Sequence, residues 1–262
     1  MNNAPNIRIE VTEGAQIPDP RDRRLLNAWT LAFCVAVVAL VTLCATQPEP
    51  YLEIVKFLPD GLIITFEVTV LSLLCTLPIG LLTGLGRLSR NPVINLIAST
   101  YVEIIRGVPL LVQLFYIYYA LGRIIQVPPM VSAVIAISFC YGAYMGEVFR
   151  AGILSVPKGQ TEAARSLGMS FNRILAKIVI PQALRSSVLP MTNLFIAVML
   201  TTALGSQVPL KPQELTGVVS YINTRSLGGV AAFFISALGY LGTAFVVSHI
   251  GNHIDKKVRI LR

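Results

Sequence analysis

The sequence predicts an all-α integral membrane protein with about six transmembrane helices. Hydrophobic residues make up 54% of the chain and charged residues only 13%, whereas a soluble domain is about a quarter charged. Apolar runs of about 18 residues or more recur along the chain. Such runs are long enough for helices that cross a bilayer.

The first 28 residues are polar and contain three prolines, which predicts a loosely attached tail. Arginines then precede an apolar run over residues 29–46, a pattern that a secretory signal peptide would also show. The leader is too long and too acidic for a signal peptide, and no small-residue cleavage site follows. We therefore expect an uncleaved extra transmembrane helix at 29–46 and a proline-containing loop over 47–60.

Five further spans are expected over residues 61–250, before a basic tail at 251–262. Regular spans are predicted at 61–86, 130–149, 189–208 and 229–250. The remaining span, at 91–122, contains Gly107 and Pro109, which should interrupt its helix. Broken backbone at membrane depth is tolerated only where protein or a water-filled cavity surrounds it. A simple kinked structural helix is the alternative.

Ionisable side chains inside these spans are candidates for function, because a charge facing lipid is costly. Glu67 lies one or two turns inside its span, where an interfacial position is the alternative. Glu103 and Arg106 are three residues apart on one helical face, so they can pair.

A polar and basic loop at about 151–188 contains several residues that typically begin or end helices. Pro157 and Gly159 break the preceding structure, and residues 160–167 are good helix formers. Gly168 follows where a helix end needs a residue that tolerates positive φ. The loop is therefore expected to be a compact element instead of a flexible linker.

A second helix of this loop should begin near residue 171, with Ser170 as its cap and Pro181 interrupting it. Ala163 and Ala164 have small side chains, so a partner surface can approach the first helix closely. Glu162 is a charge that can fix the register of such a contact. The loop is thus predicted to be a docking element, with a solvated connection as the alternative.

The distribution of basic residues predicts the topology. Sixteen of the 21 Lys and Arg residues fall on the side of the 151–188 loop and the chain ends, and four fall on the opposite side. By the positive-inside rule, the loop and both termini are cytoplasmic. The net charge of +8 therefore reflects topology, and nucleic acid is not an expected partner.

The loop has the spacing Glu162-Ala163-Ala164, three residues, Gly168, nine residues, Ile178, one residue, Ile180-Pro181. This spacing resembles the EAA loop of membrane subunits of ATP-binding-cassette importers. The flanking sequence resembles the polar amino acid branch of that family, at Tyr144, Glu147, Arg150, Gly152, 156–160 and 181–185. The 91–122 span is similar to the E-x-x-R-G-T-P-L-L-V-Q-L element of the same branch, with Val108 in place of threonine.

This resemblance implies a type I importer permease in a bacterial inner membrane, moving a polar amino acid by alternating access. It also implies that the five spans over 61–250 form the transmembrane core of the family and that the helix at 29–46 is an extra one. It implies that the loop couples the permease to a separate ATPase, which uses ATP and Mg²⁺, while this chain binds no cofactor. A second permease, an extracytoplasmic solute-binding protein and membrane lipid are the other expected partners. The implied coupling residues are Pro157, Gly159, Gln160, Glu162, Ala163, Ala164, Gly168 and Pro181.

No catalytic site or metal site is predicted. The chain has no G-x-x-x-x-G-K-[ST] phosphate loop, no metal-ligand spacing and no nucleophile with a triad. Its four cysteines lie in apolar runs, as packing residues do. The chain is therefore not expected to be an enzyme.

The candidates for the substrate path are the polar residues predicted inside the spans: Glu67, Glu103, Gln113, Asn193, Thr201 and Thr202. A packing role for the two threonines is an equal alternative. Where the branch carries K-D-T-S-L, this chain has uncharged residues at 200–204. A specialised subunit of a heterodimer and a homodimer of altered selectivity both fit that departure. Other cargo, an ion-coupled carrier and a sensor or scaffold are the rival functions.

Overall fold

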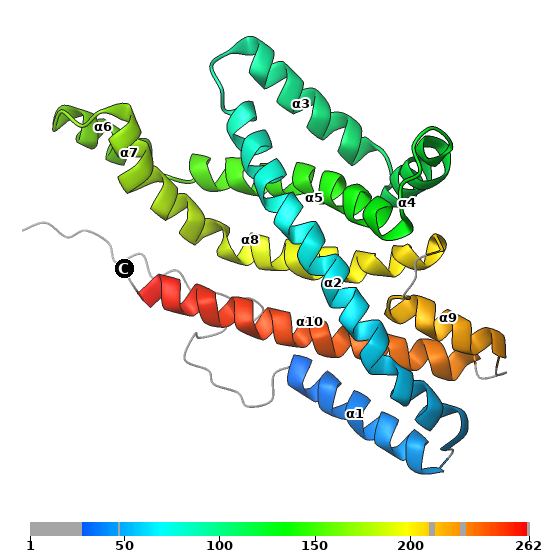
Figure 1. The fold of residues 1–262 in the computed structure, drawn as a ribbon. Helices are drawn as coiled ribbons and strands as arrows, with labels where there is room; N and C mark the ends of the chain where they lie inside the picture. Colours follow the sequence, from blue (N-terminus) through cyan, green and yellow to red (C-terminus); the bar gives the residue numbers. More distant parts are fainter. Residues whose placement is uncertain (1–27, 47, 210–212, 226–228, 261–262) are drawn as a thin grey trace, which may run out of the picture.

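The computed structural model describes residues 28–46, 48–209, 213–225 and 229–260, which form helices and turns without a strand (Figure 1). The predicted tail at 1–28 therefore lies almost entirely outside the described residues. The α-helices are α1 Ala28–Thr46, α2 Pro48–Arg87, α3 Pro92–Gly107, α4 Leu110–Phe115, α5 Pro129–Leu154, α6 Lys158–Ser166, α7 Phe171–Ile174, α8 Ile180–Thr201, α9 Leu215–Arg225 and α10 Gly229–Ile260.

Long helices packed side by side make up the body of the molecule. α5, α8 and α10 lie next to one another, and α2 crosses all three (Figure 1). α1 lies along α10 and α2, and α9 packs between α2 and α10. α6 and α7 project from one end of this layer, beyond the ends of α5 and α8.

The predicted all-α membrane fold is confirmed. Four helical stretches are long and apolar enough to span a membrane: Leu58–Arg87, Pro129–Leu154, Phe171–Gln207 and Phe233–Lys257. The helix pair Pro92–Gly107 and Leu110–Arg123, which bends by 100°, makes a fifth span if the two helices are counted as one. The described apolar part of α1, Phe33–Thr46, is shorter than such a span. The sixth transmembrane helix at 29–46 therefore stays a prediction.

Three predicted boundaries differ from the helices observed. α2 already begins at Pro48, so the loop expected over 47–60 is wrong. Proline is tolerated in the first turn of a helix, where its missing N–H has no intrahelical partner. α8 begins at Ile180, ahead of the expected 189. α10 continues to Ile260, so the residues expected as a basic tail prolong the helix.

Glycines let α2 and α5 approach each other closely along their crossing. A Cβ atom added to Gly80 would lie 2.6 Å from the Cβ of Met145, and one added to Gly84 would lie 2.8 Å from the carbonyl oxygen of Gly146. Lipid is as apolar as a leucine side chain, so helices associate in membranes through close packing and hydrogen bonds. The glycines supply that packing at the largest helix contact in the described chain.

A buried glutamate positions α9 against the spans. Glu214 is fully buried, and its carboxylate accepts hydrogen bonds from the backbone N–H groups of Thr216 and Gly217, both at 2.7 Å. The Tyr240 hydroxyl donates a third bond to it at 2.9 Å. A carboxylate at a helix N-terminus satisfies N–H groups that have no intrahelical partner. Glu214 thereby caps α9 and joins it to α10.

The α2–α5 contact predicts the effect of adding one methyl group. Gly80→Ala should lower the free energy of unfolding by about 1–3 kcal/mol, because the new Cβ would overlap Met145 close to its backbone. Thermal unfolding in mild detergent measures this change. Gly122→Ala is the matched control, since a Cβ there meets no atom within 4 Å. Equal melting temperatures for the two variants would contradict the close-packing account.

Candidate functional site

The loop between α5 and α8 forms an ordered helical turn at its centre. α6 ends at Ser166, and Gly168 follows with a φ of +74°. The N–H of Gly168 donates to the carbonyl of Arg165 at 2.9 Å, and the N–H of Met169 donates to that of Ala164 at 3.1 Å. These two bonds form a Schellman motif, which needs a left-handed residue between them. The prediction of positive φ at Gly168 is confirmed.

The second half of the loop runs directly into α8. α7 begins at Phe171 as predicted, but the Ser170 side chain makes no capping hydrogen bond. A π-helical turn at Leu175–Val179 then separates α7 from α8. This turn lies immediately before Pro181, which has no N–H to continue a regular helix. The predicted interruption at Pro181 is therefore present as a π-helical turn.

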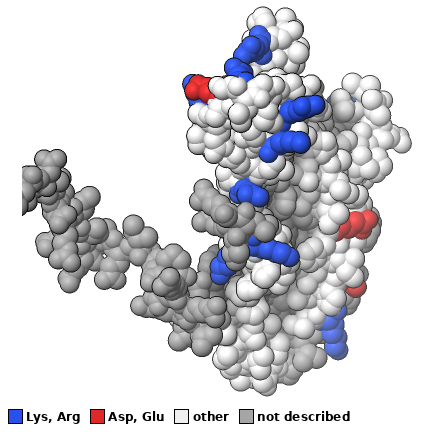
Figure 2. Space-filling model, turned by 90° about the vertical axis from the view of Figure 1, so that its left-hand side faces the viewer, with Lys and Arg blue, Asp and Glu red and all other residues white. Residues whose placement is uncertain are grey.

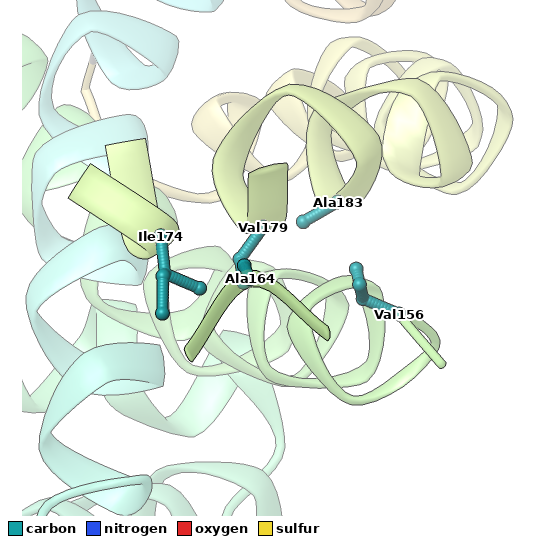
Figure 3. Close-up of a cluster of buried hydrophobic side chains, with 5 residues drawn as sticks. All are labelled: Val156, Ala164, Ile174, Val179 and Ala183. Atoms are coloured by element: carbon teal, nitrogen blue, oxygen red, sulfur yellow. The ribbon is translucent and has the colours of Figure 1, made fainter. Parts of the chain in front are cut away.

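An apolar cluster fixes this knob, residues 157–181, to the membrane helices. Ala164 of α6 packs with Val156, Ile174, Val179 and Ala183 (Figure 3). Its side chain is only 4% exposed. The expectation that Ala164 faces a partner is therefore wrong, because it is the small side chain that lets α6 lie against its own chain. Ala163, one residue earlier, is exposed.

The opposite face of the knob is open. Glu162 and Gly159 are exposed there, as is Pro157 at the start of α6. Two large apolar residues of the knob are also exposed, Leu167 at 83% and Phe171 at 63%.

A side-chain hydrogen bond links the start of α6 to the start of α8. The Gln182 amide donates to the side-chain oxygen of Gln160. Pro181 lies in the first turn of α8, half-buried, next to this bond. The residues predicted for the coupling loop therefore share one structural unit, although Ala164 faces inward.

A charge cluster around Glu147 of α5 joins three helices. Its carboxylate pairs with Arg87 at the end of α2, accepts a 3.2 Å hydrogen bond from Arg150, and lies 3.9 Å from Arg106 of α3. The expected pair between Glu103 and Arg106 is wrong, because Arg106 turns toward α5. The sequence does not show this cluster, since residues 87, 106 and 147 belong to different helices.

Gln113 holds the broken span together. Its amide donates to the backbone carbonyls of Ile105 and Val108, both at 2.8 Å. These carbonyls are left without helical partners where α3 ends. Gln113 thus donates hydrogen bonds to the backbone carbonyls at the break. This role differs from the place on the substrate path that the sequence predicts for it.

The other candidates for the substrate path do not form one site. The hydroxyl of Thr201 donates to the carbonyls of Ala197 and Val198, and that of buried Thr202 donates to Met199. Glu67, Glu103 and Asn193 are exposed. Within the described ranges, no hydrogen bond or ion pair joins any two of the six candidates.

Comparison with known families gives the class of the protein. Residues 76–260, more than two thirds of the chain, match the model of the binding-protein-dependent transport system inner membrane component. The chain belongs to this family. It is therefore a permease subunit of an ATP-binding-cassette importer and a multi-pass protein of the inner membrane, and ATP hydrolysis takes place on a separate subunit.

Named relatives cover most of this permease. The L-cystine transport system permease protein TcyB of Bacillus subtilis is 37% identical over 203 residues, which are 77% of this chain and 86% of the relative. The probable glutamine permease GlnP of Bacillus subtilis is 34% identical over 75% of this chain and 91% of its own length. The nopaline permease NocM of Agrobacterium fabrum is 32% identical over 77% of this chain and 86% of its own length.

Solved structures share the fold of the permease. An amino acid ABC transporter crystallised with histidines is similar, with a TM-score of 0.73 and 33% identity over 79% of this chain and 97% of that one. The inward-facing methionine transporter MetNI has a TM-score of 0.63 at 19% identity, over 80% of this chain and 98% of that one. This likeness shows the fold alone.

The turn at Gly168 predicts different effects for two glycines of one loop. Gly168→Ala should weaken the Schellman motif by about 1–2 kcal/mol, because a left-handed conformation is costly for a residue with a Cβ. Faster hydrogen exchange of the Met169 amide measures this loss. Gly159→Ala is the control, since Gly159 has no positive φ and open space around it. Unchanged exchange in Gly168→Ala would contradict the strain argument.

Proposed function

We propose that this permease forms the translocation path for a polar amino acid. Support comes from three relatives, which are named for L-cystine, glutamine and nopaline. These compounds differ in their side chains, but each carries an α-carboxylate and an amino nitrogen. A polar amino acid is therefore the cargo class that the relatives favour.

The knob at 157–181 is proposed to couple transport to ATP hydrolysis on the separate subunit. The observation that carries this proposal is that the knob is packed against the membrane helices and also has exposed apolar and charged residues. Ala164 packs the knob against the ends of α5 and α8, while Leu167, Phe171 and the charged Glu162 are exposed. Exposed apolar side chains that are rimmed by charges are typical of a protein-docking surface.

This arrangement supports mechanical coupling, because the knob has packed connections on both sides. Val156 follows α5 directly and lies in the apolar cluster, and the π-helical turn leads into α8. A shift of the knob therefore displaces two membrane helices together. Alternating access is then a population shift between two helix packings, driven by the preference of the ATP-bound partner for one of them.

The charge distribution supports a cytoplasmic position for the knob. Figure 2 shows Lys and Arg gathered on the face that lies at the left of Figure 1, where α6, α7 and the end of α10 are. Basic residues accumulate on the cytoplasmic side of membrane proteins. The last turn of α10 lies at this same end. Both termini are proposed to be cytoplasmic.

The proposed assembly contains two permeases, two ATPase subunits and an extracytoplasmic solute-binding protein. ATP and Mg²⁺ are expected on the ATPase subunits, and no cofactor on this chain. Whether the second permease is another copy is decided by a mild-detergent pull-down with mass spectrometry. A second permease sequence identifies a heterodimer, and this chain alone with the ATPase identifies a homodimer.

Two substitutions on the knob test the coupling role. Glu162→Lys reverses a charge on the outer face, and Gly168→Asp strains the turn beside it, so each should reduce uptake of radiolabelled L-cystine or L-glutamine at least tenfold. Uptake is measured in proteoliposomes that contain the complete complex. Arg90→Gln, an exposed charge outside the knob, is the control.

Membrane insertion and yield should be unchanged in these variants. Normal uptake by both knob variants would contradict the coupling role. Transport by the purified permease without any ATPase would favour an ion-coupled carrier instead.

A further inference from the structure

A narrow apolar cavity lies between α1, α2 and α10. It has a volume of about 260 Å³, and its walls include Phe33 of α1, Leu62 of α2, and Leu238 and Gly242 of α10. Val37, another wall residue, is 43% exposed, so the cavity is open at the surface of the helix layer. Because α2 and α10 are membrane spans, this opening faces the hydrocarbon of the bilayer.

One stripe of α10 continues from this cavity toward the end of the helix. Residues three, four or seven apart lie on the same face of a helix, so His249 follows Gly242 on this face and His253 follows His249. The stripe then reaches two lysines. The exposed side chains beyond the cavity, named here the basic stripe, are His249, His253, Lys256 and Lys257.

The other face of α10 is occupied by packing. Gly251 is buried, and a Cβ atom added to it would overlap Thr192 of α8. Asp255 lies four residues later on this face and is buried as well. It is the only acid between residues 245 and 257. The exposed face of this part of α10 is therefore purely basic.

The basic stripe is free to bind a ligand. Within the described part of the chain, its four side chains make no hydrogen bond and no ion pair. Protonated lysine offers three N–H donors, and neutral imidazole offers one. These donors and the positive charge suit an anionic group that carries several oxygens, such as a phosphate.

Stacked rings connect the cavity to the basic stripe. Phe33 of the cavity wall stacks on Phe245 with 5.3 Å between the ring centroids, and Phe245 stacks on His249 at 6.3 Å. α1 begins at Ala28, and the last turns of α10 extend beyond it (Figure 1). Helix α1 therefore covers the cavity and leaves the stripe beyond His249 uncovered.

The spacing of the two parts fits one leaflet of a bilayer. Thr243 at the cavity and His253 lie about 15 Å apart along the axis of α10, at about 1.5 Å per residue. The hydrocarbon core of a bilayer is about 30 Å thick, so one leaflet contributes about 15 Å. A phospholipid with its head group at the basic stripe thus has the end of an acyl chain at the cavity.

We propose that the basic stripe and the cavity together bind one anionic phospholipid. Its phosphate lies at the stripe, and the end of one acyl chain lies in the cavity between α1, α2 and α10. The stripe is on the side of the knob, which is proposed above to be cytoplasmic, and the cytoplasmic leaflet is the anionic one. A choline head group brings its own positive charge, which the stripe repels. The site is separate from the path of the transported solute.

Native mass spectrometry of the purified complex of permease and ATPase in mild detergent tests this site. The probes are dioleoylphosphatidylglycerol, dioleoylphosphatidylcholine and dihexanoylphosphatidylglycerol. Wild type should bind the first roughly tenfold or more tightly than either of the others, because the second has no net negative charge and the third has no long acyl chain. Equal affinity for the three probes would overturn the proposal.

A double variant tests the head-group contact. Lys256→Gln/Lys257→Gln should remove most of the preference for the glycerol over the choline head group. Arg90→Gln/Arg123→Gln is the matched control, since it removes the same charge at exposed positions far along the chain from the stripe. The control should keep the preference. An equal loss in both double variants would assign the preference to the overall charge of the protein and would overturn the site.

A glycine variant tests the cavity. Gly242→Leu fills space beside Phe33, where an added Cβ meets its nearest atom at 3.5 Å, an ordinary contact. It should reduce the affinity for dioleoylphosphatidylglycerol to that for the dihexanoyl lipid. Gly122→Leu is the control, because a Cβ there meets no atom within 4 Å. Tight binding of the dioleoyl lipid by Gly242→Leu would overturn the acyl-chain site.

The same spectra identify a protein as the rival occupant of the basic stripe. If Lys256→Gln/Lys257→Gln releases the ATPase subunit and the permease still binds dioleoylphosphatidylglycerol as wild type does, the stripe contacts the ATPase and the lipid site is wrong. An intact complex that has lost its lipid preference is the result that the proposal predicts.

Discussion

Close contact between α2 and α5 is the constraint on which the rest of the structure depends. Helices in a membrane gain little from excluding lipid, so they must approach closely enough for packing and hydrogen bonds to hold them. Gly80 and Gly84 provide that approach on α2, and Gly146 provides it on α5. The Ser138 hydroxyl adds a 3.2 Å bond to the carbonyl of Ser72 across the same contact. α5 is thereby held at the centre of the described helices.

α5 connects the parts of the molecule that matter for transport. Tyr144 and Glu147 lie in its second half and meet Arg106, next to the broken span. Its end leads through Val156 into the knob that α6 and α7 form. α5 thus connects the charge cluster around Glu147 to the proposed docking surface.

Local chemistry explains why some features could be predicted from the sequence. Gly168 follows a stretch of helix formers, and the need for a left-handed residue there is independent of the rest of the fold. The broken span follows from Gly107 and Pro109 in the same way. The start of α2 at Pro48 differs from the prediction because closely spaced prolines usually indicate a loop. The observed helix has Pro48 and Pro50 in its first turn, where proline is tolerated, and Pro59 in its interior.

Tertiary contacts explain what the sequence could not show. The inward orientation of Ala164 depends on where Ile174 and Ala183 lie, and periodicity over nine residues does not reveal that. The arginines around Glu147 come from separate helices, so the nearer Glu103 seemed the natural partner of Arg106.

Site-specific crosslinking on α6 tests the central claim most directly, because two adjacent alanines face opposite ways. In a chain whose four native cysteines are replaced, Ala163→Cys and Ala164→Cys would each be treated with a short thiol-to-amine crosslinker in the assembled complex. The account predicts that the exposed position 163 crosslinks to the ATPase subunit and that the buried position 164 does not. An intact complex without a crosslink at 163, or with equal crosslinks at both positions, would contradict it.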